Sequence, residues 1–182
     1  EFYLVNGRVI TPHRLISPGG VQIEGQYIGR VFALDQGGIP DGAQIIDVQG
    51  AWILPGLIDL HLHGGGGADC MDGQPEAIRT MARTHAKGGT TAILPTTLTS
   101  STKDLHLALQ GVQAAMEREQ DGARILGIHL EGPYFAYGQR GAQDPRYLKE
   151  PDPSEYLEIL DKYPFIKRVS AAPELPGALD LG

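Results

Sequence analysis

Two histidines are spaced as metal ligands often are. His61 and His63 end a short apolar run that begins after Pro55-Gly56 and is followed by four glycines, residues 64–67. If this run is a strand, both imidazoles lie on one face, roughly 6.6 Å apart at a ~3.3 Å rise per residue. Neutral imidazole binds zinc, iron, nickel and copper. The pair is a candidate metal site, but two solvated polar residues at a strand end would give the same pattern.

Polar residues also end two other apolar runs. His129 and Glu131 close the run 124–131, directly before Gly132-Pro133, and Thr96 and Thr97 follow the run 90–94. A glutamate in this position can be a solvated charge or a helix-capping partner. A histidine pair at another strand end of the same sheet makes a carboxylate ligand the better interpretation, since imidazole with carboxylate is a common hydrolytic zinc set.

The segments that must position these residues change character along the chain. Residues 2–53 contain short strand patterns and predict a small antiparallel β unit, with a hairpin turn at Asn6-Gly7. Beyond residue 54, strand and helix patterns alternate, which indicates a parallel α/β sheet with ligands at the C-terminal strand ends. We expect strands at 57–62, 90–94, 124–131 and 165–172, and helices at 75–87, 102–120 and 154–162.

Composition narrows the class of protein. The chain has 182 residues, of which 41% are hydrophobic and 20% charged, as in ordinary globular domains. A net charge of −7 without a basic run argues against nucleic acid and anionic membranes as partners. The single cysteine, Cys70, excludes an internal disulfide and favours a reducing, cytoplasmic location. No apolar run approaches membrane-spanning length.

Three stretches resemble a known family. Residues 54–63 resemble the opening barrel strand of the amidohydrolase superfamily, and the β unit before them resembles that superfamily's flanking β-sandwich. Residues 127–134 and 140–145 are similar to the N-acetylglucosamine-6-phosphate deacetylases, and residues 171–174 fit the next strand of that family. The stretch His129-Leu130-Glu131-Gly132-Pro133 is the most specific of these, because the paired histidines are shared by many amidohydrolases.

The resemblance implies an α/β fold: the first half of a metal-dependent (β/α)8 TIM barrel preceded by a small β-sandwich segment. Residues 1–53 would be the β domain, and residues 54–182 the first four β/α units, with the C-terminal half absent. The implied activity is hydrolysis of the N-acetyl group of N-acetylglucosamine 6-phosphate to glucosamine 6-phosphate and acetate. The implied general base, an aspartate, and two further metal histidines lie beyond Gly182, so we expect this piece alone to be inactive. A homodimer is expected of the full-length enzyme.

The resemblance also implies roles for individual residues of this chain. Glu131 matches the family's metal glutamate, and His61 and His63 match the ligands of members that hold a second ion. Ala142 and Gln143 match positions that contact the sugar, although many members have histidine in place of Gln143. The implied cofactor is one or two divalent metal ions per chain, zinc first, with iron, cobalt or manganese as alternatives. His129 is expected beside the metal site and not as a ligand.

Other functions stay open at this point. A dihydroorotase-like or hydantoinase-like enzyme usually has a carboxylated lysine on the fourth strand, where this chain has Lys167 only at the start. An N-acetylgalactosamine-6-phosphate deacetylase and an inactive metal-binding fragment are further alternatives. The remaining histidines, the cysteine and the aspartate after the glycines are expected to be structural: His13, His85, His106, Cys70 and Asp72.

Overall fold

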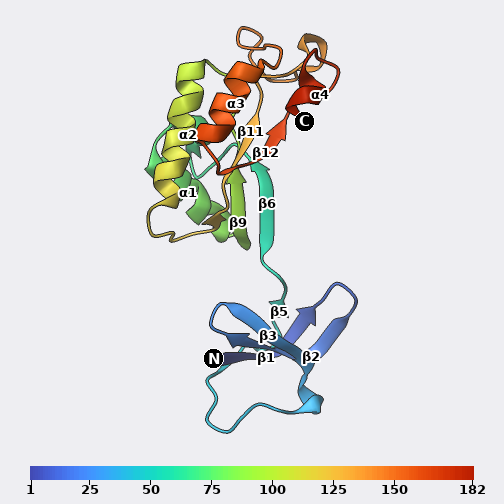
Figure 1. Ribbon diagram of the computed structural model, residues 1–182. Coiled ribbons are helices and arrows are strands. Elements are labelled where there is room, and N and C mark those ends of the chain that lie inside the picture. Colours follow the sequence, from blue (N-terminus) through green and yellow to red (C-terminus); the bar gives the residue numbers. More distant parts are fainter. The chain divides into compact units, whose positions relative to one another are not determined.

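The computed structural model describes residues 1–182, which form two compact units, Glu1–Pro55 and Gly56–Gly182. The division falls two residues after the boundary predicted from the sequence. Figure 1 shows the strands and helices of each unit. Each unit has its own hydrophobic core. No helix combines the length and apolar character needed to cross a membrane.

The first unit is a five-stranded sheet with the order β3-β2-β1-β4, in which β5 also pairs with β1. Its strands are β1 (Phe2–Ile10), β2 (Leu15–Glu24), β3 (Tyr27–Ala33), β4 (Ile45–Asp47) and β5 (Trp52–Ile53), with a short 3-10 helix η1 (Leu34–Gln36). Strands β1, β2 and β3 are antiparallel, whereas β4 and β5 run parallel to β1. The expectation of a purely antiparallel unit is therefore wrong for its last two strands.

The predicted hairpin at Asn6-Gly7 is also wrong. Asn6 has a φ of 59°, but the chain continues through it as one strand, β1, and the pairing with β2 shifts register on both sides of Gly7. A left-handed residue can make a bulge as well as a turn. Here both halves of β1 pair with the long strand β2, so they do not pair with each other.

The second unit alternates strands and helices as predicted. Its long elements are β6 (Leu57–Leu62), α1 (Pro75–Ala86), β9 (Thr90–Pro95), α2 (Thr102–Met116), β11 (Ile128–Glu131), α3 (Pro153–Lys162) and β12 (Ile166–Ser170). Its shorter elements, none of them predicted, are β7 (Gly64–Gly65), β8 (Ala68–Asp69), η2 (Cys70–Asp72), η3 (Tyr137–Gln139) and α4 (Ala178–Leu181).

Apart from the short antiparallel pair β7 and β8, the strands of this unit are parallel and lie in two linked groups. One group has the order β10-β9-β6, where β10 is Arg124–Ile125, and the other pairs β11 with β12. A single bridge between Thr96 and His129 connects them. The predicted strand 124–131 is thus two strands, because the chain changes neighbour at Gly127. A Cβ on Gly127 would lie 2.2 Å from the backbone oxygen of Phe165. Only glycine therefore fits where the chain passes this close to Phe165.

Helices α1 and α2 pack against the sheet and form one core with it. Ile78, Met81, Leu109 and Val112 are fully buried and belong to the same cluster as Ile93 of β9. Local sequence sets the first residue of each of these two helices. The Ser101 side chain accepts a hydrogen bond from the Asp104 N–H and caps α2, and α1 starts at Pro75, where proline fits the first helical turn.

Candidate metal centre

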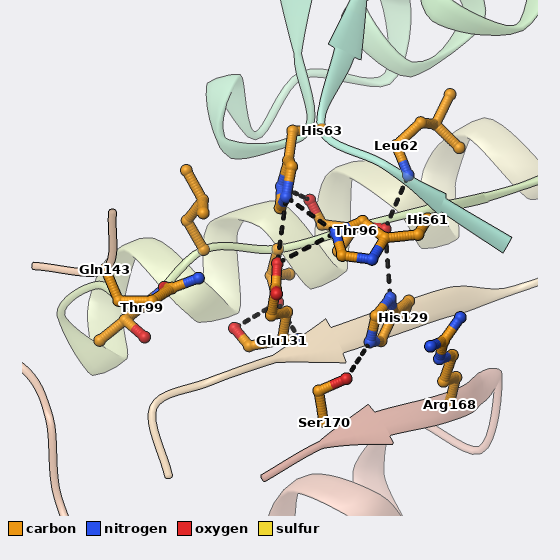
Figure 2. Close-up of polar contacts among 12 residues, drawn as sticks. His61, Leu62, His63, Thr96, Thr99, His129, Glu131, Gln143, Arg168 and Ser170 are labelled. Carbon is orange, nitrogen blue, oxygen red and sulfur yellow. Dashed lines mark hydrogen bonds and ion pairs between the residues drawn. The ribbon is translucent and has the colours of Figure 1, made fainter. Parts of the chain in front are cut away.

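Three side chains converge at the C-terminal end of the sheet. His61 lies near the end of β6, His63 directly follows that strand, and Glu131 is the last residue of β11. The Nε2 atoms of the two imidazole rings are 3.1 Å apart. Glu131 Oε2 lies 3.3 Å from His61 Nε2 and 3.0 Å from His63 Nε2 (Figure 2). These are the three ligands predicted from the sequence, and the structure brings their donor atoms together.

Hydrogen bonding orients one lone pair toward the centre of this triangle. His63 Nδ1 is 3.2 Å from the backbone oxygen of Thr96. A carbonyl oxygen only accepts, so Nδ1 carries the proton, and the neutral ring has its lone pair on Nε2, which faces Glu131. Glu131 Oε2 is buried and receives no hydrogen bond. Facing lone pairs repel each other unless a cation or a shared proton lies between them.

The triangle has the size of one face of a zinc tetrahedron. Zinc–nitrogen and zinc–oxygen bonds of about 2.0–2.1 Å in tetrahedral geometry place neighbouring donors about 3.3 Å apart. The three observed edges are 3.0, 3.1 and 3.3 Å. Two imidazoles and one carboxylate also suit a divalent ion of this kind. The residues present therefore fit the metal that the sequence implies.

His129 supports the triangle without joining it. It is fully buried, its Nε2 lies 2.8 Å from Ser170 Oγ, and its ring meets that of His61 edge to face with a centroid distance of 4.9 Å. Burial first, and the Arg168 cation second, lower the pKa of His129 to about 4. A neutral ring at this place packs against His61 and adds no positive charge beside the site. Ser170 was not identified from the sequence, because no local pattern distinguishes a serine that faces a neighbouring strand.

The predicted sugar-contacting loop meets the same end of the sheet. Gln143 Oε1 accepts a hydrogen bond of 2.8 Å from the backbone N–H of Thr99, just beyond β9 (Figure 2). Its Oε1 is thereby used within the protein, which leaves the amide NH2 group as a donor for another partner. Ala142 is exposed.

His85, His106 and Asp72 have local polar partners, and Cys70 is enclosed by the core. His85 Nε2 lies 3.0 Å from the backbone oxygen of Gly64, and His106 Nδ1 lies 2.9 Å from the Tyr163 hydroxyl. Cys70 is fully buried, and Asp72 belongs to a capping box with Asp69 at the start of η2. These contacts are consistent with the structural roles expected of these residues.

Comparison with known proteins places the chain in a family. The profile described as "Amidohydrolase family" matches residues 52–178, which is more than half of the chain and includes the whole triangle. The chain belongs to the amidohydrolase family. The membership predicted from the strand with His61 and His63 is therefore confirmed.

Two relatives illustrate the similarity of this amidohydrolase to curated proteins. It is 38% identical over 128 residues to an N-acetylgalactosamine-6-phosphate deacetylase from Escherichia coli O157:H7, covering 70% of the chain and 34% of that protein. It is 37% identical over 131 residues to an N-acetylglucosamine-6-phosphate deacetylase from Vibrio furnissii, covering 70% of the chain and 32% of that protein. The chain spans about a third of the length of these two relatives.

Solved structures agree on the fold. The N-acetylglucosamine-6-phosphate deacetylase from Pasteurella multocida superposes with a TM-score of 0.86 at 27% identity, covering 98% of this chain and 46% of that one. A Mycobacterium smegmatis enzyme of the same name gives 0.85 at 30% identity, covering 99% and 45%. The predicted fold class, an α/β chain that forms part of an amidohydrolase (β/α)8 barrel, is confirmed.

Proposed function

We propose that this amidohydrolase is part of a metal-dependent deacetylase that converts N-acetylglucosamine 6-phosphate to glucosamine 6-phosphate and acetate. The observation that carries the proposal is the triangle of His61, His63 and Glu131, which has donor spacings suited to a divalent ion. Relatives with this activity in their names supply the substrate class. In the reaction, a water oxygen bonds to the amide carbonyl carbon, the carbon–nitrogen bond breaks, and the nitrogen leaves with a proton as the amine.

The residues of this chain bind and orient in that reaction. His61, His63 and Glu131 would hold one shared ion, since their donors form one triangle; the resemblance instead assigns the histidines to a second ion. When bound, such an ion polarises a carbonyl and lowers the pKa of bound water toward about 7. Glu131 is the only carboxylate in the cluster, so the cluster binds the metal and supplies no separate general base. Gln143, with its oxygen held by Thr99, offers an N–H donor to a sugar oxygen.

Several finer statements belong to the same proposal. Zinc is our first choice of metal, with iron, cobalt and manganese as alternatives, because the donor set is two imidazoles and a carboxylate. We propose that residues 54–182 are the first four β/α units of the catalytic barrel, and that residues 1–53 are structural.

Buried, unpaired Cys70 supports a cytoplasmic location, and the charge of −7 supports the absence of nucleic-acid and membrane partners. The homodimer rests on family resemblance, and light scattering of the full-length protein tests it.

A second substrate is supported by the names of two relatives. The relative from Escherichia coli O157:H7, 38% identical, is named for N-acetylgalactosamine 6-phosphate. The two sugars differ in the configuration of one hydroxyl group, which no contact within this chain distinguishes.

Acetate release by the full-length protein tests the proposal. The substrates are the 6-phosphates of N-acetylglucosamine and N-acetylgalactosamine, with unphosphorylated N-acetylglucosamine as control, before and after metal removal by chelation. We expect metal-dependent turnover of N-acetylglucosamine 6-phosphate and poor turnover of the unphosphorylated sugar. Preference for the galactosamine compound would favour the second substrate. Absence of turnover with both phosphates, or equal turnover without the phosphate, would contradict the proposal.

A further inference from the structure

Two adjacent threonines join the strands that carry the metal-binding triangle. Thr96 and Thr97 follow β9, the strand between β6 and β11, and both are fully buried. Consecutive residues of an extended chain point to opposite sides. Buried hydroxyl groups are expected to be hydrogen-bonded, and the partners here lie on two different strands.

Thr96 binds the end of β6, between the two histidines. Its Oγ1 accepts a hydrogen bond of 3.0 Å from the Leu62 N–H, and its own N–H donates to the Leu62 oxygen at 2.9 Å (Figure 2). Its backbone oxygen accepts the His63 Nδ1 proton at 3.2 Å. One residue thus fixes the backbone of Leu62 and the ring of His63.

Thr97 makes the corresponding contacts with β11. Its Oγ1 accepts a hydrogen bond of 3.0 Å from the Glu131 N–H and donates to the Glu131 oxygen at 3.4 Å. Its backbone N–H donates to the His129 oxygen at 3.1 Å. The backbone of the carboxylate ligand is therefore held by a side chain as well as by the sheet.

Both hydroxyl groups act where regular sheet pairing fails. Pairing of β6 with β9 loses register between Asp59 and Leu62, and β9 meets β11 through the single bridge of Thr96 and His129. The backbone N–H groups of the two threonines still bond to Leu62 and His129, but a continuous backbone ladder is absent there. The threonine hydroxyl groups supply the missing hydrogen bonds on both sides.

We propose that Thr96 and Thr97 are positioning residues that hold His63 and Glu131 at metal-binding distance. The inference rests on the metal site of the proposed function and adds the device that sets its geometry. Partners that orient metal ligands typically contribute ten- to a hundredfold to metal affinity. The backbone contacts of each threonine survive substitution, so the hydroxyl groups can be tested separately.

Cobalt(II) binding by the full-length protein tests the proposal, measured by calorimetry and by the visible d–d absorption. Thr96→Val and Thr97→Val keep the shape and remove the hydroxyl group, whereas Thr96→Ser and Thr97→Ser keep it. We expect each valine variant to bind cobalt about 10- to 100-fold more weakly with a changed spectrum, and each serine variant to stay within about threefold of the unsubstituted protein. Thr91→Val is the matched control. Thr91 is exposed and lies on the same strand, and its Oγ1 donates to the Leu57 oxygen at 3.3 Å, at the opposite end of β6.

Circular dichroism and unfolding in chelator separate a binding effect from loss of the fold. If a valine variant does not fold, alanine replaces valine in the comparison with serine, and a serine-to-alanine affinity ratio of at least tenfold is expected. Folded valine variants that bind cobalt like the unsubstituted protein would overturn the inference, as would serine variants as weak as valine variants. Failure of the unsubstituted protein to bind cobalt would instead contradict the proposed metal site.

Discussion

Glu131→Gln should change metal affinity and metal-free stability in opposite directions. In the metal-free protein at pH 8, Glu131 Oε2 is buried without a hydrogen bond and faces the Nε2 atoms of His61 and His63 at 3.3 and 3.0 Å. Glutamine has nearly the same shape, but its NH2 group can occupy the position of Oε2. That group has two N–H donors, one for the Nε2 lone pair of His63 and one for that of His61 when the His61 proton is on Nδ1.

The size of both effects follows from these contacts. Two new hydrogen bonds at about 1 kcal/mol each, less the cost of imperfect angles, raise the free energy of unfolding by about 1–2 kcal/mol. The urea midpoint then rises by roughly 0.5–1 M for a slope of about 2 kcal/mol/M. Metal affinity falls at least about 100-fold, or about 2.7 kcal/mol, because a ligand and the negative charge of the triangle are lost together.

Zinc or cobalt calorimetry and urea unfolding in chelator measure the two quantities. Glu158→Gln is the matched control, because Glu158 is an exposed carboxylate on α3, and both of its values should remain unchanged. Unaltered metal affinity in Glu131→Gln would refute its assignment as a ligand. A metal-free variant less stable than the unsubstituted protein would refute the argument that Oε2 lacks a donor.

Two further predictions concern the histidines and the cysteine. His61→Asn and His63→Asn should each lower metal affinity at least tenfold. Metal analysis should find one ion per chain in the unsubstituted protein. If both variants retain the ion at full affinity, the histidine pair is structural. Cys70 should resist thiol reagents at pH 8 until the protein unfolds, because burial, with Asp69 and Asp72 adding to it, raises its pKa to about 12. Its thiolate fraction is then lower than that of an ordinary cysteine by on the order of a thousandfold, and rapid labelling of the folded protein would disprove this.

Local sequence signals were sufficient for the existence and order of the long elements of the second unit, but not for its short strands and helical turns. Helix α1 starts at Pro75 and gives way to Gly88-Gly89, and β6 lies between Pro55-Gly56 and the glycines, so turn residues mark their ends. Pairing between distant strands has no comparable local signal. The parallel placement of β4, the bulge at Asn6 and the change of neighbour at Gly127 all depend on which strand lies alongside, and these are the positions where the predictions were wrong.

The same limit applies to the site. Residue type and spacing identified the candidate ligands, but the sequence could not show that β6 and β11 both flank β9. Neighbouring strands lie about 4.8 Å apart, so strands separated by a third lie about 9.6 Å apart. Donor atoms from β6 and β11 nevertheless approach to 3.0 Å, between His63 and Glu131.

Long side chains from both flanking strands must cover that separation above the end of β9. Histidine and glutamate have the necessary reach, whereas aspartate in place of Glu131 would be shorter by one methylene group. The strand between them must also end in residues whose side chains do not fill the space, and Thr96 and Thr97 use their hydroxyl groups to bind the neighbouring backbones instead. Glutamate at position 131 and the two threonines after β9 therefore serve the same geometric requirement. The ligands from the two outer strands must meet above the end of the middle strand.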